Sequence, residues 1–123
     1  MIQEDKELLL KDLCARLPYG VCYKHFTWDD ERGEECIAAQ IYSINSDGYV
    51  KNCYDDETVY IDNVRPYLFP LSSMTKKRLE EFSEYIDIKN AYVAVDLLNS
   101  HHIDYRGLIE KGLAIDATGL NIY

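Results

Sequence analysis

Alternation of apolar and polar residues between positions 21 and 64 is the feature that most constrains the fold of this chain. Short turn sequences interrupt the alternation, among them Asp29-Asp30-Glu31-Arg32-Gly33 and Ser46-Asp47-Gly48. A period of two is typical of half-buried strands, and an Asp-Gly step tolerates the positive φ of a hairpin turn. The pattern predicts four consecutive antiparallel strands, at Val21–Trp28, Glu35–Asn45, Tyr49–Tyr54 and Thr58–Val64.

Leucines recur at helical spacing before these strands, with four of them on one face: Leu9, Leu10, Leu13 and Leu17. This spacing predicts an amphipathic helix from Gln3 to Leu17. Pro18 follows directly, and proline lacks an amide donor and disfavours helix in the residue before it. We therefore expect the helix to end just before the first strand.

The segment from Arg65 to Leu71 contains Pro66 and Pro70, which exclude a helix. Its apolar residues need a core, so we expect it to run extended and to seal one edge of the sheet. Three helices are predicted behind it: Thr75 to Ile86, Ala91 to Ser100, and Asp104 to Lys111, the last ended by Gly112. The tail from Ala114 to Tyr123 has no clear period.

These elements predict a single α+β domain spanning residues 1–123. The expected order is an N-terminal helix, a small curved antiparallel sheet of about four or five strands, and C-terminal helices. Four short twisted strands and the extended segment suffice for an SH3-like barrel, and an open sheet with helices on one face is the alternative. A chain of this length buries roughly two thirds of its unfolded surface, so neither a disulfide nor a metal is needed for folding.

The net charge of −9 argues against nucleic-acid binding, because phosphate contacts need cationic surface. The chain has one basic stretch, which contains Arg65, Lys76, Lys77 and Arg78. These four residues are a candidate contact for an anion or a partner. Solvated surface charges are the alternative, and we favour that interpretation.

No apolar stretch is long enough to cross a bilayer, and the first residues have no signal-peptide pattern. We therefore expect a cytoplasmic protein without membrane contact. Its four cysteines have no CxxC spacing, so we predict reduced thiols, most of them buried as small apolar side chains, and no zinc site: Cys14, Cys22, Cys36 and Cys53. We expect no cofactor.

His101, His102 and Asp104 are the weak candidates for catalysis or metal binding. Adjacent histidines point in different directions and seldom bind one ion without a distant third ligand. The alternative is that the histidines end one helix and Asp104 caps the next, and we favour it. The acidic turns 29–31 and 55–57 offer carboxylates to a hard cation, although we favour solvated turns there too.

Tyrosine is common in the predicted strands, and an exposed row of tyrosines would make a binding surface. We expect about half of the strand tyrosines to lie in the core, and the sequence does not decide which: Tyr23, Tyr42, Tyr49, Tyr54 and Tyr60.

Three segments resemble a family of small uncharacterised proteins of gut Bacteroidetes and their prophages: residues 8–21, Arg65-Pro66-Tyr67-Leu68-Phe69-Pro70-Leu71-Ser72-Ser73-Met74-Thr75, and residues 98–114 with His101-His102 and Asp104-Tyr105-Arg106-Gly107. The resemblance implies a bacterial or phage cytoplasmic setting and one domain. It implies no activity and no site residue. This chain departs from its apparent relatives after Thr75, where they tend to have acids and it has Lys76-Lys77-Arg78.

Our leading functional hypothesis is a non-enzymatic, monomeric module that binds a protein partner through the curved sheet and its loops. It rests on the many tyrosines and acidic loops together with the lack of a familiar reactive motif. Two alternatives are a small metal-dependent hydrolase that uses His101, His102 and Asp104, and an acidic nucleic-acid mimic that inhibits a DNA-binding protein.

Overall fold

The computed structural model describes residues 1–55, 57–74, 80 and 91–123, and it begins with helix α1 (Gln3–Arg16). Leu9 and Leu13 of this helix are fully buried in the core, as their spacing predicts. A 3-10 turn (Leu17–Tyr19) extends α1, and Gly20 ends it with a φ of 72°. The positive φ at this position suits glycine, which has no Cβ to clash.

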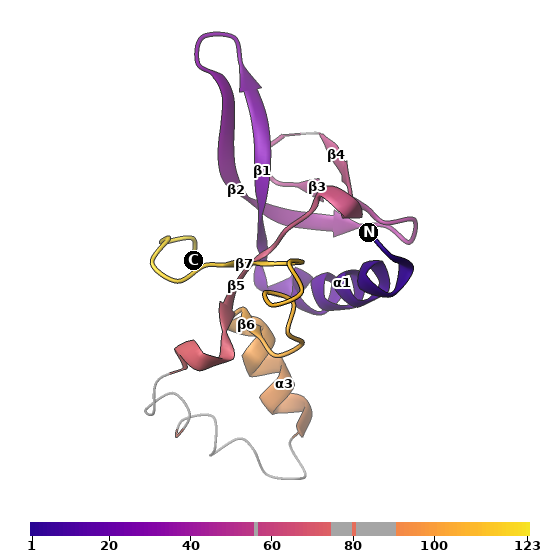
Figure 1. Cartoon of the computed structure of the whole chain (residues 1–123), viewed down its shortest axis with the longest axis vertical. Coiled ribbons are helices and arrows are strands. Elements are labelled where there is room, and N and C mark those ends of the chain that lie inside the picture. Colours follow the sequence, from indigo (N-terminus) through magenta and orange to yellow (C-terminus); the bar gives the residue numbers. More distant parts are fainter. Residues whose placement is uncertain (56, 75–79, 81–90) are drawn as a thin grey trace.

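Four antiparallel strands follow in the order of the chain, as the alternation predicts. Their bounds are β1 (Cys22–Asp29), β2 (Gly33–Ile44), β3 (Tyr49–Asn52) and β4 (Thr58–Tyr60). The sheet curls into a half-barrel over α1, and the far ends of β1 and β2 extend beyond the rest of the molecule (Figure 1). The predicted α+β class is therefore confirmed, with the core on the side of the sheet that faces the helix.

The expected fourth strand is shorter than its sequence pattern, because a 3-10 helix (Ile61–Asn63) replaces its second half. The extended segment then meets the edge of the sheet at β1, as predicted. There the Lys24 amide donates to the Arg65 carbonyl at 3.1 Å, and Tyr23 forms a β-bridge with Pro66.

Beyond Pro66 the chain enters a second, parallel sheet that the sequence analysis did not predict. Strand β5 (Tyr67–Pro70) lies between β6 (Ile103–Asp104) and β7 (Ile115–Asp116). Two-residue strands leave no local pattern, because their backbone partners are distant in sequence. This sheet brings the C-terminal segment against β1 and the end of α1.

The C-terminal half contains helix α3 (Ala91–Ser100), which agrees with the predicted helix over the same residues. The predicted helix from Thr75 to Ile86 lies outside the described residues, apart from position 80. The predicted helix from Asp104 to Lys111 is wrong, since residues 105–107 are irregular and residues 108–112 form turns. Gly107 has a φ of 74°, which is incompatible with a right-handed helix, while Asp104 accepts hydrogen bonds from two amides downstream.

The cysteines also differ from expectation. All four are free thiols, yet Cys14, Cys36 and Cys53 are exposed and Cys22 is half-buried. Cys14 of α1 and Cys36 of β2 occupy outward positions of their elements, Cys36 opposite the exposed Phe26, and Cys53 follows the end of β3. The prediction that most of them are buried is therefore wrong. In the part of the chain that is described, no helix combines the length and apolar character required to span a membrane.

Candidate functional site

His101, His102 and Asp104, the weak candidates for catalysis or metal binding, have separate surroundings in the structure. His101 is exposed after α3. His102 is buried, and its ring stacks on Tyr123 with 3.8 Å between the ring centroids. Asp104 lines a cavity of about 250 Å³, but both of its oxygens accept backbone hydrogen bonds. The geometry gives no support to a shared metal or reaction at these residues.

Polar side chains from α1 and the C-terminal segment surround His102 in a cluster that we call the polar junction (Asp12, Arg16, His102, Arg106 and Tyr123). Arg16 donates to both Asp12 oxygens, at 2.9 and 3.1 Å, and both side chains are fully buried. Arg106 adds a hydrogen bond to Asp12 at 3.1 Å. The Tyr123 hydroxyl accepts from a β1 amide at 2.9 Å and donates to a β5 carbonyl at 2.7 Å.

Burial changes the protonation of His102 in this junction. It lowers the pKa of His102 from 6.5 to about 4, with smaller contributions from the positive charge of Arg16 and from His101. The ring is therefore neutral at neutral pH and packs as an aromatic group. These contacts tie α1, β1 and the second sheet together, and they give His102 a structural role in packing.

The basic residues are only partly described. Arg65 is half-buried and donates to the Val64 carbonyl at 2.9 Å. Lys76, Lys77 and Arg78 lie outside the described residues. Contact of this group with an anion or a partner therefore stays a prediction.

The strand tyrosines separate into two sets. Tyr23 is fully buried, and Tyr60 is half-buried against the core. Tyr42, Tyr49 and Tyr54 are exposed. The ring of Tyr49 packs on Tyr60 across β3 and β4 with centroids 5.2 Å apart, so that pair belongs to the sheet face. The exposed rings lie on different strands and loops.

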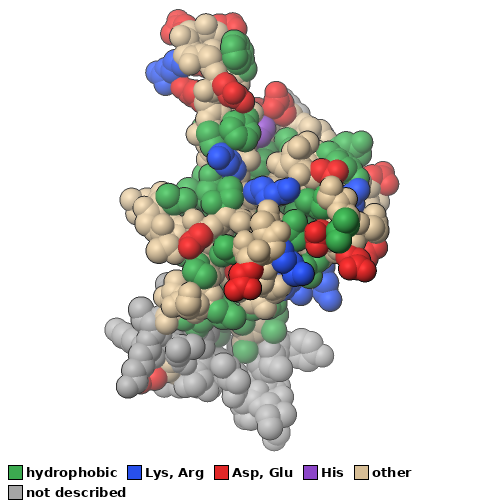
Figure 2. Space-filling model, viewed as in Figure 1, with side chains coloured by type: hydrophobic (Ala, Val, Ile, Leu, Met, Phe, Trp, Pro, Cys, Tyr) green, Lys and Arg blue, Asp and Glu red, His purple; other side chains and the backbone are tan. Residues whose placement is uncertain are grey.

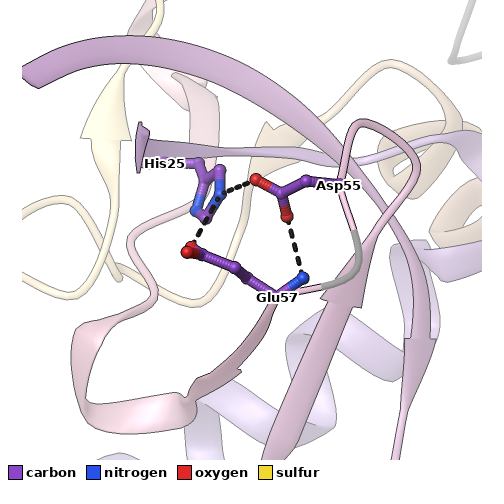
Figure 3. A group of neighbouring side chains, drawn as sticks. All are labelled: His25, Asp55 and Glu57. Atoms are coloured by element: carbon purple, nitrogen blue, oxygen red, sulfur yellow. Dashed lines mark hydrogen bonds and ion pairs between the residues drawn. The ribbon is translucent and has the colours of Figure 1, made fainter. Parts of the chain in front are cut away.

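A histidine that the sequence analysis did not single out is the centre of another cluster. His25 of β1 is 3% exposed, and its Nε2 lies 2.9 Å from Asp55 Oδ2 and 3.6 Å from Glu57 Oε2. The two carboxylates come from the loop between β3 and β4 and point toward the imidazole (Figure 3). We call His25, Asp55 and Glu57 the His–acid cluster.

Two further buried groups hold the cluster in place. His25 Nδ1 lies 3.1 Å from the Tyr23 hydroxyl, and Asn52 Nδ2 donates to the same hydroxyl at 2.9 Å. The Asn52 Oδ1 accepts the backbone amides of Tyr54 and Asp55, each at 2.8 Å. The sheet and its loop therefore fix both the ring of His25 and the backbone that carries the carboxylates.

The protonation of the cluster follows from these contacts. Burial alone would raise the pKa of Asp55, but hydrogen bonds from His25, the Glu57 amide and Asn52 outweigh it, so the pKa is lowered. Burial raises the pKa of Tyr23, and the nearby carboxylate charges add to this effect while the Asn52 hydrogen bond opposes it. At neutral pH the cluster therefore holds an ionised Asp55 beside a protonated tyrosine.

A cavity of about 130 Å³ adjoins the His–acid cluster. Tyr23, His25 and Glu57 line it together with Phe26 and Val59. The cavity has room for a few water molecules, since one water needs about 10–15 Å³ of such volume. The cluster therefore combines fixed ligand atoms with access for small molecules.

The acidic turn at 55–57 was recognised from the sequence, whereas His25 was not. A usable signal was present, because the period of two that makes Tyr23 inward-facing places His25 on the same face. What the sequence could not show is the fold of the β3–β4 loop over that face.

The outer end of the β1–β2 hairpin is a separate surface, which we call the hairpin arm (residues 26–37). Phe26 and Trp28 lie on one face of the arm and are 52% and 74% exposed. Strand β3 pairs with β2 only from Ile41 onward, so this sheet gives the arm no third strand. The arm projects from the top of Figure 2, where acidic groups surround its end.

The arm has the composition of a surface loop and the backbone of a two-stranded antiparallel ribbon. It contains five carboxylates and one arginine, Arg32, which pairs with Glu35 at 3.4 Å. Trp28 Nε1 donates to Asp30 at 3.3 Å, and the Lys24 ammonium lies 5.4 Å from the centre of the Phe26 ring. The two exposed rings are thus framed by charge.

Comparison with known proteins adds no relative: no protein-family model, curated protein or solved structure matches the chain.

Proposed function

We propose that this chain is a non-enzymatic protein-interaction module and that its hairpin arm is the binding element. One observation carries the proposal: Trp28 and Phe26 stand exposed, side by side on one face of a ribbon outside the core. Tryptophan is among the residues most enriched in binding hot spots, because a single ring buries a large area at low entropic cost.

The backbone of the arm supports the same interpretation. An isolated two-stranded ribbon is marginally stable in water, and exposed aromatic rings on it are a liability. In this chain the arm continues the strands of a packed sheet, so its base is fixed while its outer face is uncovered (Figure 1). A partner that covers the rings would remove the apolar surface and order the ribbon.

The charge of the arm defines the chemistry of the partner. Five carboxylates against one arginine favour a basic protein surface, with an apolar pocket that receives Trp28. Pairing of opposite charges at the rim speeds association and makes it sensitive to salt. We therefore propose that the arm binds in a cationic groove of a partner protein.

The biological setting is part of this proposal. The resemblance to small proteins of gut Bacteroidetes and their prophages supports a bacterial or phage protein that acts in the cytoplasm. We further propose that it acts as a monomer. The alternative of a nucleic-acid mimic predicts the same cationic groove, with the difference that DNA would compete for it.

Photo-cross-linking in host cells tests the proposal. A photoreactive phenylalanine analogue is placed at Phe26, in the arm, or at Tyr54, which is 65% exposed outside the arm. We expect one dominant adduct with a basic protein from the Phe26 position and none from the Tyr54 position. The adduct should weaken in the Asp30→Asn, Glu31→Gln double variant and at high salt.

Other outcomes change or remove the proposal. Identical adducts from both positions, or none from either, would contradict it. An adduct between two copies of the chain would show self-association in place of a partner. Loss of the adduct when duplex DNA competes for the purified partner would identify the nucleic-acid mimic.

A further inference from the structure

We propose that the His–acid cluster binds a divalent transition-metal cation of the Zn²⁺ class through His25 Nε2 and the carboxylates of Asp55 and Glu57. The ligand atoms of these three residues all lie within 4.8 Å of one another. Imidazole nitrogen combined with carboxylate oxygen is a ligand set that zinc and its neighbours in the first transition row accept. None of the three ligands belongs to the hairpin arm that carries the proposed function, although Phe26 of the arm lines the cavity beside the cluster.

The observed distances already approach those of a coordinated ion. Ligand atoms that lie about 2.0–2.1 Å from a tetrahedral zinc are about 3.3 Å apart. The distances from His25 Nε2 to Asp55 Oδ2 and Glu57 Oε2, 2.9 and 3.6 Å, lie on either side of that value. The carboxylate oxygens of Asp55 and Glu57 lie within 4.8 Å of each other, and rotation of the two side chains would bring them to the spacing of a coordinated ion.

The contacts behind the histidine match those of metal-binding histidines. Such histidines use their second ring nitrogen in a hydrogen bond that fixes the tautomer and the ring orientation. His25 Nδ1 has this contact with the Tyr23 hydroxyl at 3.1 Å. A hydroxyl can donate or accept a hydrogen bond. When Tyr23 donates to Nδ1, the proton of His25 is on Nε2, which then donates to Asp55. When Tyr23 accepts from Nδ1, Nε2 has no proton and is free to bind a metal.

The charge of the cluster also favours a cation. Within the described residues, the carboxylates of Asp55 and Glu57 contact the imidazole of His25 and form no ion pair with a lysine or arginine. Lys24 lines the adjoining cavity, where its ammonium lies 5.4 Å from the centre of the Phe26 ring. Two carboxylates beside a largely buried imidazole therefore make a local negative centre that a bound cation would neutralise.

Hydrogen bonds hold the carboxylate of Asp55 in position. Asp55 Oδ1 accepts the Glu57 amide at 3.0 Å and the Asn52 side-chain amide at 3.2 Å, which leaves Oδ2 facing His25. Three protein ligands leave at least one coordination position for water, and the adjoining cavity of about 130 Å³ lies beside it. This is the open arrangement that accepts a further small ligand.

Titration of the full, chelator-treated chain with Zn²⁺ and Co²⁺ tests the site, with calorimetry for the first ion and visible absorption for the second. We expect one ion per chain and a cobalt spectrum without a thiolate charge-transfer band, which separates the cluster from the free cysteines. Ca²⁺ should bind far more weakly, because it prefers six to eight oxygen ligands.

Glu57→Gln is the decisive variant, because the Glu57 side chain is 66% exposed and its contact in the cluster is the 3.6 Å pair with His25. We expect at least a tenfold loss of Zn²⁺ affinity with an unchanged urea midpoint, and Tyr23→Phe to lose about 10- to 100-fold through the orientation of His25. Glu34→Gln, on the hairpin arm, is the matched control and should bind as the wild type.

Unchanged Zn²⁺ affinity in Glu57→Gln would overturn the proposal. The same holds if Ca²⁺ binds as tightly as Zn²⁺, or if Co²⁺ shows only thiolate coordination. His25→Asn should abolish binding, and if that variant fails to fold, Glu57→Gln alone decides.

Discussion

The polar junction and the hairpin arm are built from the same kinds of side chain, aromatic rings and charged groups, but they place them in opposite surroundings. In the junction Asp12 and Arg16 are fully buried and joined by two hydrogen bonds. In the arm Trp28 is 74% exposed, and Arg32 forms a single ion pair at the surface. The same kinds of side chain therefore contribute to stability in one region and lie at an exposed surface in the other.

The difference follows from what surrounds each group. A buried charge without a partner costs several kcal/mol, so removal of either Asp12 or Arg16 should have a large effect on folding. An exposed ion pair contributes about 0–1 kcal/mol, and an exposed ring contributes little until another molecule covers it. Stability measurements on matched variants can therefore show which region serves folding.

The largest effect is expected for Asp12→Ala. The change leaves the buried guanidinium of Arg16 without its carboxylate and should lower the free energy of unfolding by about 3–5 kcal/mol. Urea denaturation followed by circular dichroism measures it. Arg32→Ala removes the surface pair of the arm and is the matched control, with an expected change below about 1 kcal/mol. Equal losses in the two variants would remove the distinction between the regions.

Acid should weaken the junction through His102. The folded-state pKa of about 4 lies below the unfolded value of 6.5, so the unfolded chain takes up the proton first as the pH falls. This contribution to stability is complete above pH 6.5 and is lost by about pH 4, with a loss of about 2 kcal/mol between pH 7 and pH 5. Urea titrations at these two pH values measure the loss.

His102→Asn should flatten this pH dependence, and asparagine tolerates the φ of 57° at position 102. His101→Asn changes an exposed neighbour and should retain the pH dependence. A His102→Asn profile that parallels the wild type would show that burial of the imidazole does not control the acid response.

Tyr123→Phe should have a smaller effect. It removes the hydroxyl that joins a β1 amide to a β5 carbonyl, and it should cost about 1–2 kcal/mol while the stacking on His102 persists. Tyr54→Phe is the control, because Tyr54 is 65% exposed and its ring lies outside the junction. Equal stability of the two variants would mean that the Tyr123 hydroxyl does not hold the sheets together.

Local patterns were enough to predict the elements that local patterns form. The leucine spacing of α1 and the alternation of the four strands gave the α+β class and the order of the antiparallel sheet. The second sheet was missed, because β6 and β7 are two residues long and depend on β5, more than 30 residues away in the chain. The segment after Asp104 was predicted to be a helix because its composition is otherwise helical. Gly107 interrupts it with a positive φ.

The candidate sites were predicted less well. Asp104 was expected to accept hydrogen bonds from backbone amides, and it does so, although the segment that it caps is a turn. His25 looked like an ordinary strand residue, because its partners come from a loop 30 residues later. The exposure of Trp28 was equally hidden, since alternation gives the two faces of a strand but not where the supporting sheet ends.

The affinity of Trp28→Ala for the cross-linked partner, measured beside its stability, tests the central claim that the arm serves binding and the junction serves folding. We expect the free energy of unfolding to stay within about 0.5 kcal/mol of the wild type and the affinity to fall at least about 30-fold, which corresponds to 2 kcal/mol. A variant that binds the partner as tightly as the wild type, or that loses as much stability as Asp12→Ala, would contradict the account.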